Sequence, residues 1–122
     1  MAKLSDLVNV NINRDKIIIQ GAEIPISFSM ETMEFIGDGY DSDYAIFEAE
    51  LNAMMHQEKV RLDRKSLKIM RTLIYGMVRS GGTECTPKEL DNSIPLSQVV
   101  NVFEVCLDLF QRQNFDDKDL KK

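Results

Sequence analysis

The sequence predicts an α+β fold that is mostly helical, with a small N-terminal β-hairpin or three-stranded meander followed by four to five helices. Before about residue 28, β-branched residues alternate with polar ones or form short runs, which is typical of strands. Beyond that point, apolar residues recur every three or four positions, which is typical of amphipathic helices. We expect a single domain over 1–122, with a β-rich part over 1–28, a helical part over 29–114 and a frayed charged tail over 115–122.

The β-rich part contains three candidate strands. Residues 8–12 alternate apolar and polar side chains, and "NRD" at 13–15 predicts a turn. The runs "KIIIQ" (16–20) and "EIPISFS" (23–29) then predict two strands with a short connection between them. A proline within the second run lacks a backbone donor, so this strand is expected at an edge of the sheet. The apolar side chains expected on one face of that strand are Ile24, Ile26 and Phe28.

Capping residues predict where the first four helices begin. A short helix after Ser29 is expected to end at "GDG" (37–39), because glycines commonly terminate helices. Asp43 and Asp63 are expected to cap the second and third helices, and "TPKE" at 86–89 forms a capping box for a fourth. The third helix has a clear apolar face, which consists of Leu67, Met70, Leu73, Ile74, Met77 and Val78.

The final helix, expected from about Leu96 to Asn114, has apolar side chains on most of its surface. Burying one face alone would therefore leave other apolar side chains exposed to water. A second, narrower row lies outside its broad apolar stripe and consists of Val102, Val105 and Leu109. Either neighbouring elements of the same domain cover this row or another chain does. Because a chain of this length has a thin core, we expect the row to mediate self-association and make the protein a homo-oligomer. The broad stripe consists of Val99, Val100, Phe103, Cys106, Leu107 and Phe110.

Charge is distributed unevenly along the chain. The net charge of −5 and the isoelectric point near 4.9 argue against nucleic acid as a partner, since phosphate contacts need a basic surface. Eight acidic residues and no basic one lie between Glu31 and Glu58, and six basic residues then follow with only Asp63 among them. These segments either attract each other within the monomer or form acidic-to-basic contacts between subunits, which would favour rings or head-to-tail stacks.

Chemical motifs are few. The loop "DGYDSD" (38–43) has clustered aspartates, but its spacing fits no calcium-binding loop. His56 is the single histidine, and neither Cys85 nor Ser80 stands in a catalytic spacing with it. Phosphate-binding glycine motifs are also missing from the sequence. We therefore expect no enzyme, no cofactor and no metal site.

The methionines and cysteines suggest a cytoplasmic binding module. Seven methionines mostly occupy apolar helix positions, where they fill a core or, as for Met54 and Met55, line an adaptable groove for a partner. Two cysteines cannot form a disulfide framework, so a reducing compartment is expected. The N-terminus lacks a signal-peptide pattern and no run reaches membrane-spanning length, so we expect neither secretion nor a membrane partner.

The order of elements resembles that of phage tail assembly chaperones from long-tailed phages and prophages of Gram-positive bacteria. The stretches that carry the resemblance are "KIIIQGAEIPISFSMETMEFI", "SLKIMRTLIYGMVRSGG" and "TPKELDNSI", followed by the long apolar helix, within 16–114. The resemblance implies a non-enzymatic protein of the bacterial host cytoplasm that binds the tape measure protein, keeps its helical apolar surface soluble and helps to recruit tail tube subunits. It assigns no particular residue to binding.

A second interpretation belongs to a different class of protein. The acidic segment between Glu31 and Glu58 would also suit a cytoplasmic adaptor or regulator that binds and blocks a partner protein, for example by mimicking the charge of DNA.

Overall fold

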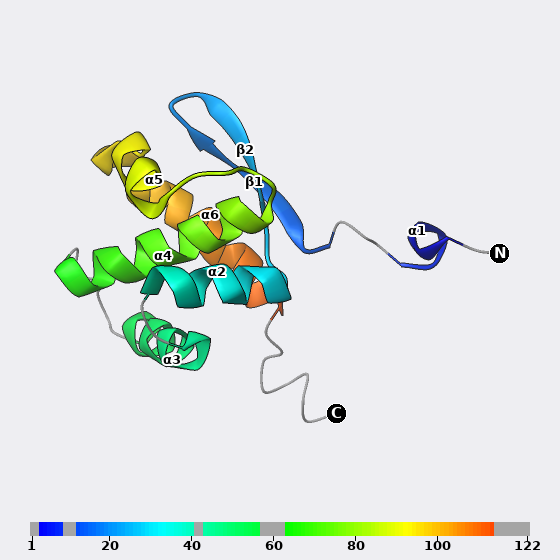
Figure 1. Cartoon of the computed structure of the whole chain (residues 1–122), viewed down its shortest axis with the longest axis horizontal. Coiled ribbons are helices and arrows are strands. Elements are labelled where there is room, and N and C mark those ends of the chain that lie inside the picture. The colour runs from blue at the N-terminus through cyan, green and yellow to red at the C-terminus, as the bar shows by residue number, and fades with distance from the viewer. Residues whose placement is uncertain (1–2, 9–11, 41–42, 57–62, 114–122) are drawn as a thin grey trace.

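A computed structural model describes residues 3–8, 12–40, 43–56 and 63–113 of the chain. The architecture is α+β and mostly helical, with one antiparallel N-terminal hairpin followed by helices, as expected from the sequence (Figure 1). The expected tail over 115–122, and Asn114 at the expected end of the final helix, lie outside the described residues. The elements are α1 (Leu4–Leu7), β1 (Arg14–Ile19), β2 (Ala22–Ser27), α2 (Met30–Tyr40), α3 (Tyr44–Met55), α4 (Arg64–Ser80), α5 (Pro87–Ser93) and α6 (Leu96–Gln113).

Among the described residues the sheet has two strands, which is the first of the two expected alternatives, the hairpin. β1 and β2 pair with Ile19 opposite Ala22, and the two residues between them both have positive φ, as in tight hairpin turns. Of the run 8–12, residues 9–11 lie outside the described part of the chain, and neither Val8 nor Ile12 is in a strand. Upstream of this run the chain forms the short helix α1. At its N-terminal end, the Asp6 carboxylate accepts a hydrogen bond of 3.2 Å from the Lys3 backbone N–H.

Helix α2 continues past the glycines that were expected to end it. It runs through residues 37–39 to Tyr40, whose buried ring packs against Phe47 of α3 at 5.1 Å between centroids. Gly39 lies beside the ring of Tyr75 in α4. Tertiary packing at the end of α2 therefore outweighs the low helix propensity of the two glycines.

The expected caps are confirmed for α4 and α5. The Asp63 carboxylate accepts from the Ser66 backbone N–H at 2.8 Å, and the Thr86 hydroxyl accepts from the Glu89 N–H at 3.1 Å. Asp43 does precede α3, but its side chain makes no capping hydrogen bond, so that part of the expectation is wrong.

Helix α4 forms the centre of the molecule. It packs against α2, α3, α5, α6 and β2, and Figure 1 shows it crossing the middle of the fold. Gly76 allows a close approach to α2, because a Cβ atom there would lie 2.5 Å from Ile36 Cγ1. The expected apolar face of α4 is buried apart from Leu67, which is partly buried, and the burial extends to Ser66, Ile69, Thr72, Tyr75 and Gly76.

Helix α6 packs against both α4 and the hairpin, which favours the first of the two alternatives for its second apolar row, namely cover by elements of the same domain. Val102 and Leu109 are buried, and Val105 is partly buried against the same core. β1 packs on α6 through its own buried Ile17 and Ile19. Two of the three side chains of the second apolar row are therefore buried within the same chain, on a helix that packs against both α4 and β1.

Candidate partner-binding surfaces

An open groove remains between β1 and α6. Its volume is about 470 Å³, and Ile18 at its edge is 57% exposed. Strand periodicity explains this position, because Ile17 and Ile19 point to the core and the residue between them must point the other way. The groove is lined by Asp15, Lys16, Ile18, Asn101, Glu104, Val105 and Asp108.

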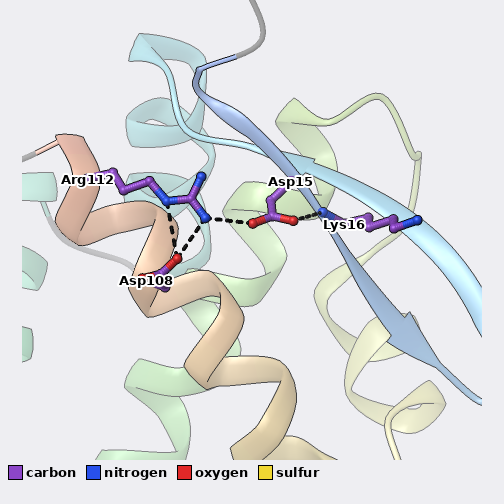
Figure 2. Close-up of polar contacts among 4 residues, drawn as sticks. All are labelled: Asp15, Lys16, Asp108 and Arg112. Carbon is purple, nitrogen blue, oxygen red and sulfur yellow. Dashed lines mark hydrogen bonds and ion pairs between the residues drawn. The ribbon is translucent and has the colours of Figure 1, made fainter.

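A polar network fixes one end of β1 on α6 (Figure 2). The Arg112 guanidinium donates from Nη2 to Asp15 Oδ2 at 2.9 Å and to Asp108 Oδ2 at 2.7 Å. The other oxygen of Asp15 accepts from the Lys16 backbone N–H at 2.8 Å. Hydrogen bonds to Asp108 and then to Asp15 raise the pKa of Arg112 above its ordinary value. Asp15 therefore lines the groove while its carboxylate is hydrogen-bonded to α6 through Arg112.

A second contact fixes the other end of the strand. The backbone N–H of Gln20, in the hairpin turn, donates to Gln98 Oε1 at 3.3 Å, and its side-chain amide donates to the Ser93 carbonyl at 2.7 Å. Hydrogen bonds therefore connect β1 to α6 near both ends of the strand. The groove lining combines apolar side chains with three carboxylates and one lysine, Lys16, so its excess negative charge suits a segment that carries apolar and basic residues.

The exposed face of α4 forms a basic surface. Arg64, Lys65 and Lys68 are exposed and Arg71 is partly exposed. Two hollows flank Lys68, one of about 230 Å³ that also contains Arg71 and one of about 420 Å³ that also contains Arg64. Lys68 Nζ lies 4.9 Å from the centre of the Tyr40 ring.

The acidic segment compensates this basic surface only in part. Lys65 Nζ lies 3.8 Å from Glu50 Oε1 of α3, which is a contact of the expected intramolecular kind. Glu50 also accepts a hydrogen bond from the Tyr40 hydroxyl, and burial, followed by this carboxylate, raises the pKa of Tyr40. Arg71 Nη1 lies 3.8 Å from Asp91 of α5, so its partner comes from outside the acidic segment.

The five residues that the sequence suggested for partner binding differ in how far they are buried. Val102, Leu109 and Met54 are buried, so their side chains cannot meet a partner without a change in the fold. Val105 and Met55 are partly buried, and of these Val105 lines the groove beside β1. Sequence reasoning missed Ile18, although three consecutive isoleucines in a strand indicate that one of them faces away from the core.

The candidate catalytic side chains have separate structural contacts. His56 follows α3, with Nδ1 2.6 Å from the Asn52 carbonyl oxygen. The Ser80 hydroxyl donates to the Ser27 carbonyl at 2.8 Å, and the Cys85 carbonyl accepts from Arg79 at 2.9 Å. Residues 41–42 of the aspartate loop lie outside the described residues. In the described ranges, no group of three or more His, Cys, Asp or Glu side chains is arranged to hold a metal ion.

Comparisons of the chain with family models, with curated proteins and with solved structures find no match. Among the described helices, none alone is long and apolar enough to span a membrane. α5 together with residues Leu96–Arg112 meets that requirement only as a pair bent by 116°.

Proposed function

We propose that the protein is a non-enzymatic tail assembly chaperone that binds helical segments of a tape measure protein in the host cytoplasm and assists assembly of the tail tube. The observation that carries the proposal is the open groove between β1 and α6, where the exposed Ile18 lies beside the partly exposed Val105. An amphipathic helix binds by laying its apolar face in such a groove. The resemblance to tail assembly chaperones implies that the tape measure protein has long helical apolar surfaces before assembly, and these need this kind of cover.

Two further features support this function. The hairpin runs directly into α2 through Ser29, and α4 is followed by a short capped α5 and a long apolar α6, which is the order of elements that the sequence resemblance rests on. The groove rim carries Asp15, Glu104 and Asp108, so the preferred segment has lysine or arginine beside its apolar row. Arg112 already pairs with two of these carboxylates, so apolar burial supplies most of the binding.

The proposal implies that a tape measure protein is encoded near this gene, so the test is binding to that protein. Co-expression should yield a complex and more soluble tape measure protein, and calorimetry with its helical fragments should give the affinity. Ile18→Glu places a charge in the groove and should weaken binding at least about tenfold, which corresponds to about 1.4 kcal/mol. Since Ile18 is 57% exposed, this variant should fold normally.

Ile46→Glu is the matched control. It makes the same change at a side chain that is 48% exposed on α3, which lies on the other side of α2 and α4 from the hairpin (Figure 1). Its affinity should equal that of the wild type. The proposal is wrong if the wild type neither forms a complex nor solubilises the tape measure protein. If both variants bind like the wild type, binding does occur but uses a surface other than the groove.

A further inference from the structure

We propose that the basic face of α4 binds the acidic face of α2 of a second copy of this chain, so that copies stack head to tail. The cationic row consists of Arg64, Lys68 and Arg71, and the acidic row consists of Glu31, Glu34 and Asp38. This contact is separate from the groove between β1 and α6 and does not depend on the function proposed for that groove.

The cationic row projects from the N-terminal half of α4. Its members are spaced i, i+4 and i+7, so they lie on one face of the helix. Two of its members have weak contacts within the chain: Arg71 lies 3.8 Å from Asp91, whereas charge-assisted hydrogen bonds are about 2.7 to 2.9 Å long, and Lys68 Nζ lies 4.9 Å from the centre of the Tyr40 ring. The hollows of about 230 and 420 Å³ on either side of Lys68 leave room for incoming carboxylate side chains.

The acidic row has the corresponding arrangement on α2. Its members are spaced i, i+3 and i+7, all three side chains are exposed, and α2 contains no lysine or arginine. They lie on the side of the helix opposite its buried residues, which are Thr32, Ile36 and Tyr40.

The two rows match in length and in number of charges. Each places three like charges over eight residues, and the seven steps from first to last cover about 10 Å along a helix that rises 1.5 Å per residue. They cannot meet within one chain, because α2 packs on α4 through Ile36 and Gly76, and the acidic row faces away from that contact. A second copy can bring its acidic row to the cationic row of the first.

The contact joins two different surfaces, so it is heterologous, and a pair of copies keeps one acidic row free on one copy and one cationic row free on the other. Further copies can therefore add to a stack. Because all six side chains lie near the surface, the attraction is weak and screened by salt over a Debye length of about 8 to 10 Å. The stack should form at high protein concentration and low ionic strength, and should dissociate as salt is added.

A charge-swap experiment tests the proposal. Arg64→Glu/Lys68→Glu makes the cationic row acidic, and Glu31→Lys/Glu34→Lys makes the acidic row basic. Each variant alone then presents like charges at the contact, so its self-association should fall at least tenfold in sedimentation equilibrium at low salt. In an equimolar mixture, each variant meets a complementary partner at both of its rows, so association should return to the wild-type level.

Matched controls carry the same charge changes elsewhere. Glu84→Lys/Glu104→Lys alters two exposed acidic residues outside the row, and Lys16→Glu/Lys88→Glu alters two exposed basic ones. Both controls, and Ile18→Glu in the groove, should self-associate like the wild type. A wild type that stays monomeric at about 1 mM protein and low salt would overturn the proposal. So would swapped variants that fail to associate when mixed although circular dichroism shows both to be folded.

Discussion

The guanidinium of Arg112 lies 2.9 Å from the carboxylate of Asp15, a contact between residues 97 positions apart in the sequence. It joins the start of β1 to the last turns of α6 and lies at the edge of the groove. The two side chains are 43% and 31% exposed, so water competes for both charges. The ion pair therefore sets where the start of β1 lies on α6, whereas buried apolar side chains supply most of the stability of this packing.

The first prediction concerns the strength of this ion pair. A double-mutant cycle with Arg112→Ala and Asp15→Ala should give a coupling free energy below about 1 kcal/mol, as for other partly exposed pairs. The measurement is urea unfolding of the wild type, both single variants and the double variant. Added salt should reduce the coupling further. A coupling of several kcal/mol would show that β1 is held mainly by this ion pair.

The second prediction concerns the second apolar row of α6, to which Leu109 belongs. Leu109 is 0% exposed, so Leu109→Ala should lower the free energy of unfolding by about 2 to 5 kcal/mol. Leu96→Ala is the control on the same helix, because Leu96 is 73% exposed, and it should change stability by no more than about 0.5 kcal/mol. Equal effects of the two substitutions in urea unfolding would mean that Leu109 is not buried as described.

This row also shows what sequence reasoning could predict. Helical periodicity identified the extra apolar positions Val102, Val105 and Leu109, because periodicity depends on nearby residues. It could not identify what buries Val102 and Leu109, because α6 packs against elements earlier in the chain, β1 among them, and only the folded structure brings these together. A second chain was therefore expected where elements of the same chain lie.

The same limit applies at other positions. The caps of α4 and α5 were predicted because a cap is a contact between residues three positions apart. The end of α2 was not predicted correctly, because Tyr40 is buried against residues of α3 and α4 and the glycines at 37 and 39 give no sign of those contacts. The candidate groove was partly predictable: Val105 was identified, and Ile18 could have been identified from strand alternation.

The third prediction compares two helical glycines. Gly76→Ala should lower the free energy of unfolding by about 1 to 3 kcal/mol, because the new Cβ would lie 2.5 Å from Ile36 Cγ1 and 3.2 Å from the Thr32 carbonyl oxygen. The branched side chain of Ile36 is buried and has little freedom to turn away.

Gly39→Ala is the matched substitution in α2. Its new Cβ would lie 3.4 Å from Tyr75 Cδ2, an ordinary contact, so the better helix propensity of alanine should raise stability by about 0.5 to 1 kcal/mol. Thermal unfolding of both variants checks the pair. A loss of stability for Gly39→Ala would mean that α2 does not continue as a regular helix to Tyr40.

The last prediction concerns stability at alkaline pH. Burial raises the pKa of the Cys106 thiol above its ordinary value of 9.0, and the negative charge of Asp15 adds to the shift. The folded protein therefore keeps the thiol proton at a pH where the unfolded chain releases it. Stability is unaffected near neutral pH and falls as the pH rises above 9.0, with a slope that approaches about 1.4 kcal/mol per pH unit for this group.

Tyr40 should act in the same direction at higher pH, because burial and then Glu50 raise its pKa above the ordinary value of 10.0. The midpoint urea concentration of unfolding, measured from neutral pH to above pH 10, checks this trend. Cys106→Ala should flatten the first part of the decline, whereas Cys85→Ala, at a partly exposed thiol, should flatten it less.

In native protein a thiol reagent should modify Cys85 before Cys106, since the buried thiol becomes accessible only on unfolding. Equal labelling rates for the two cysteines would contradict the burial of α6 between α4 and β1.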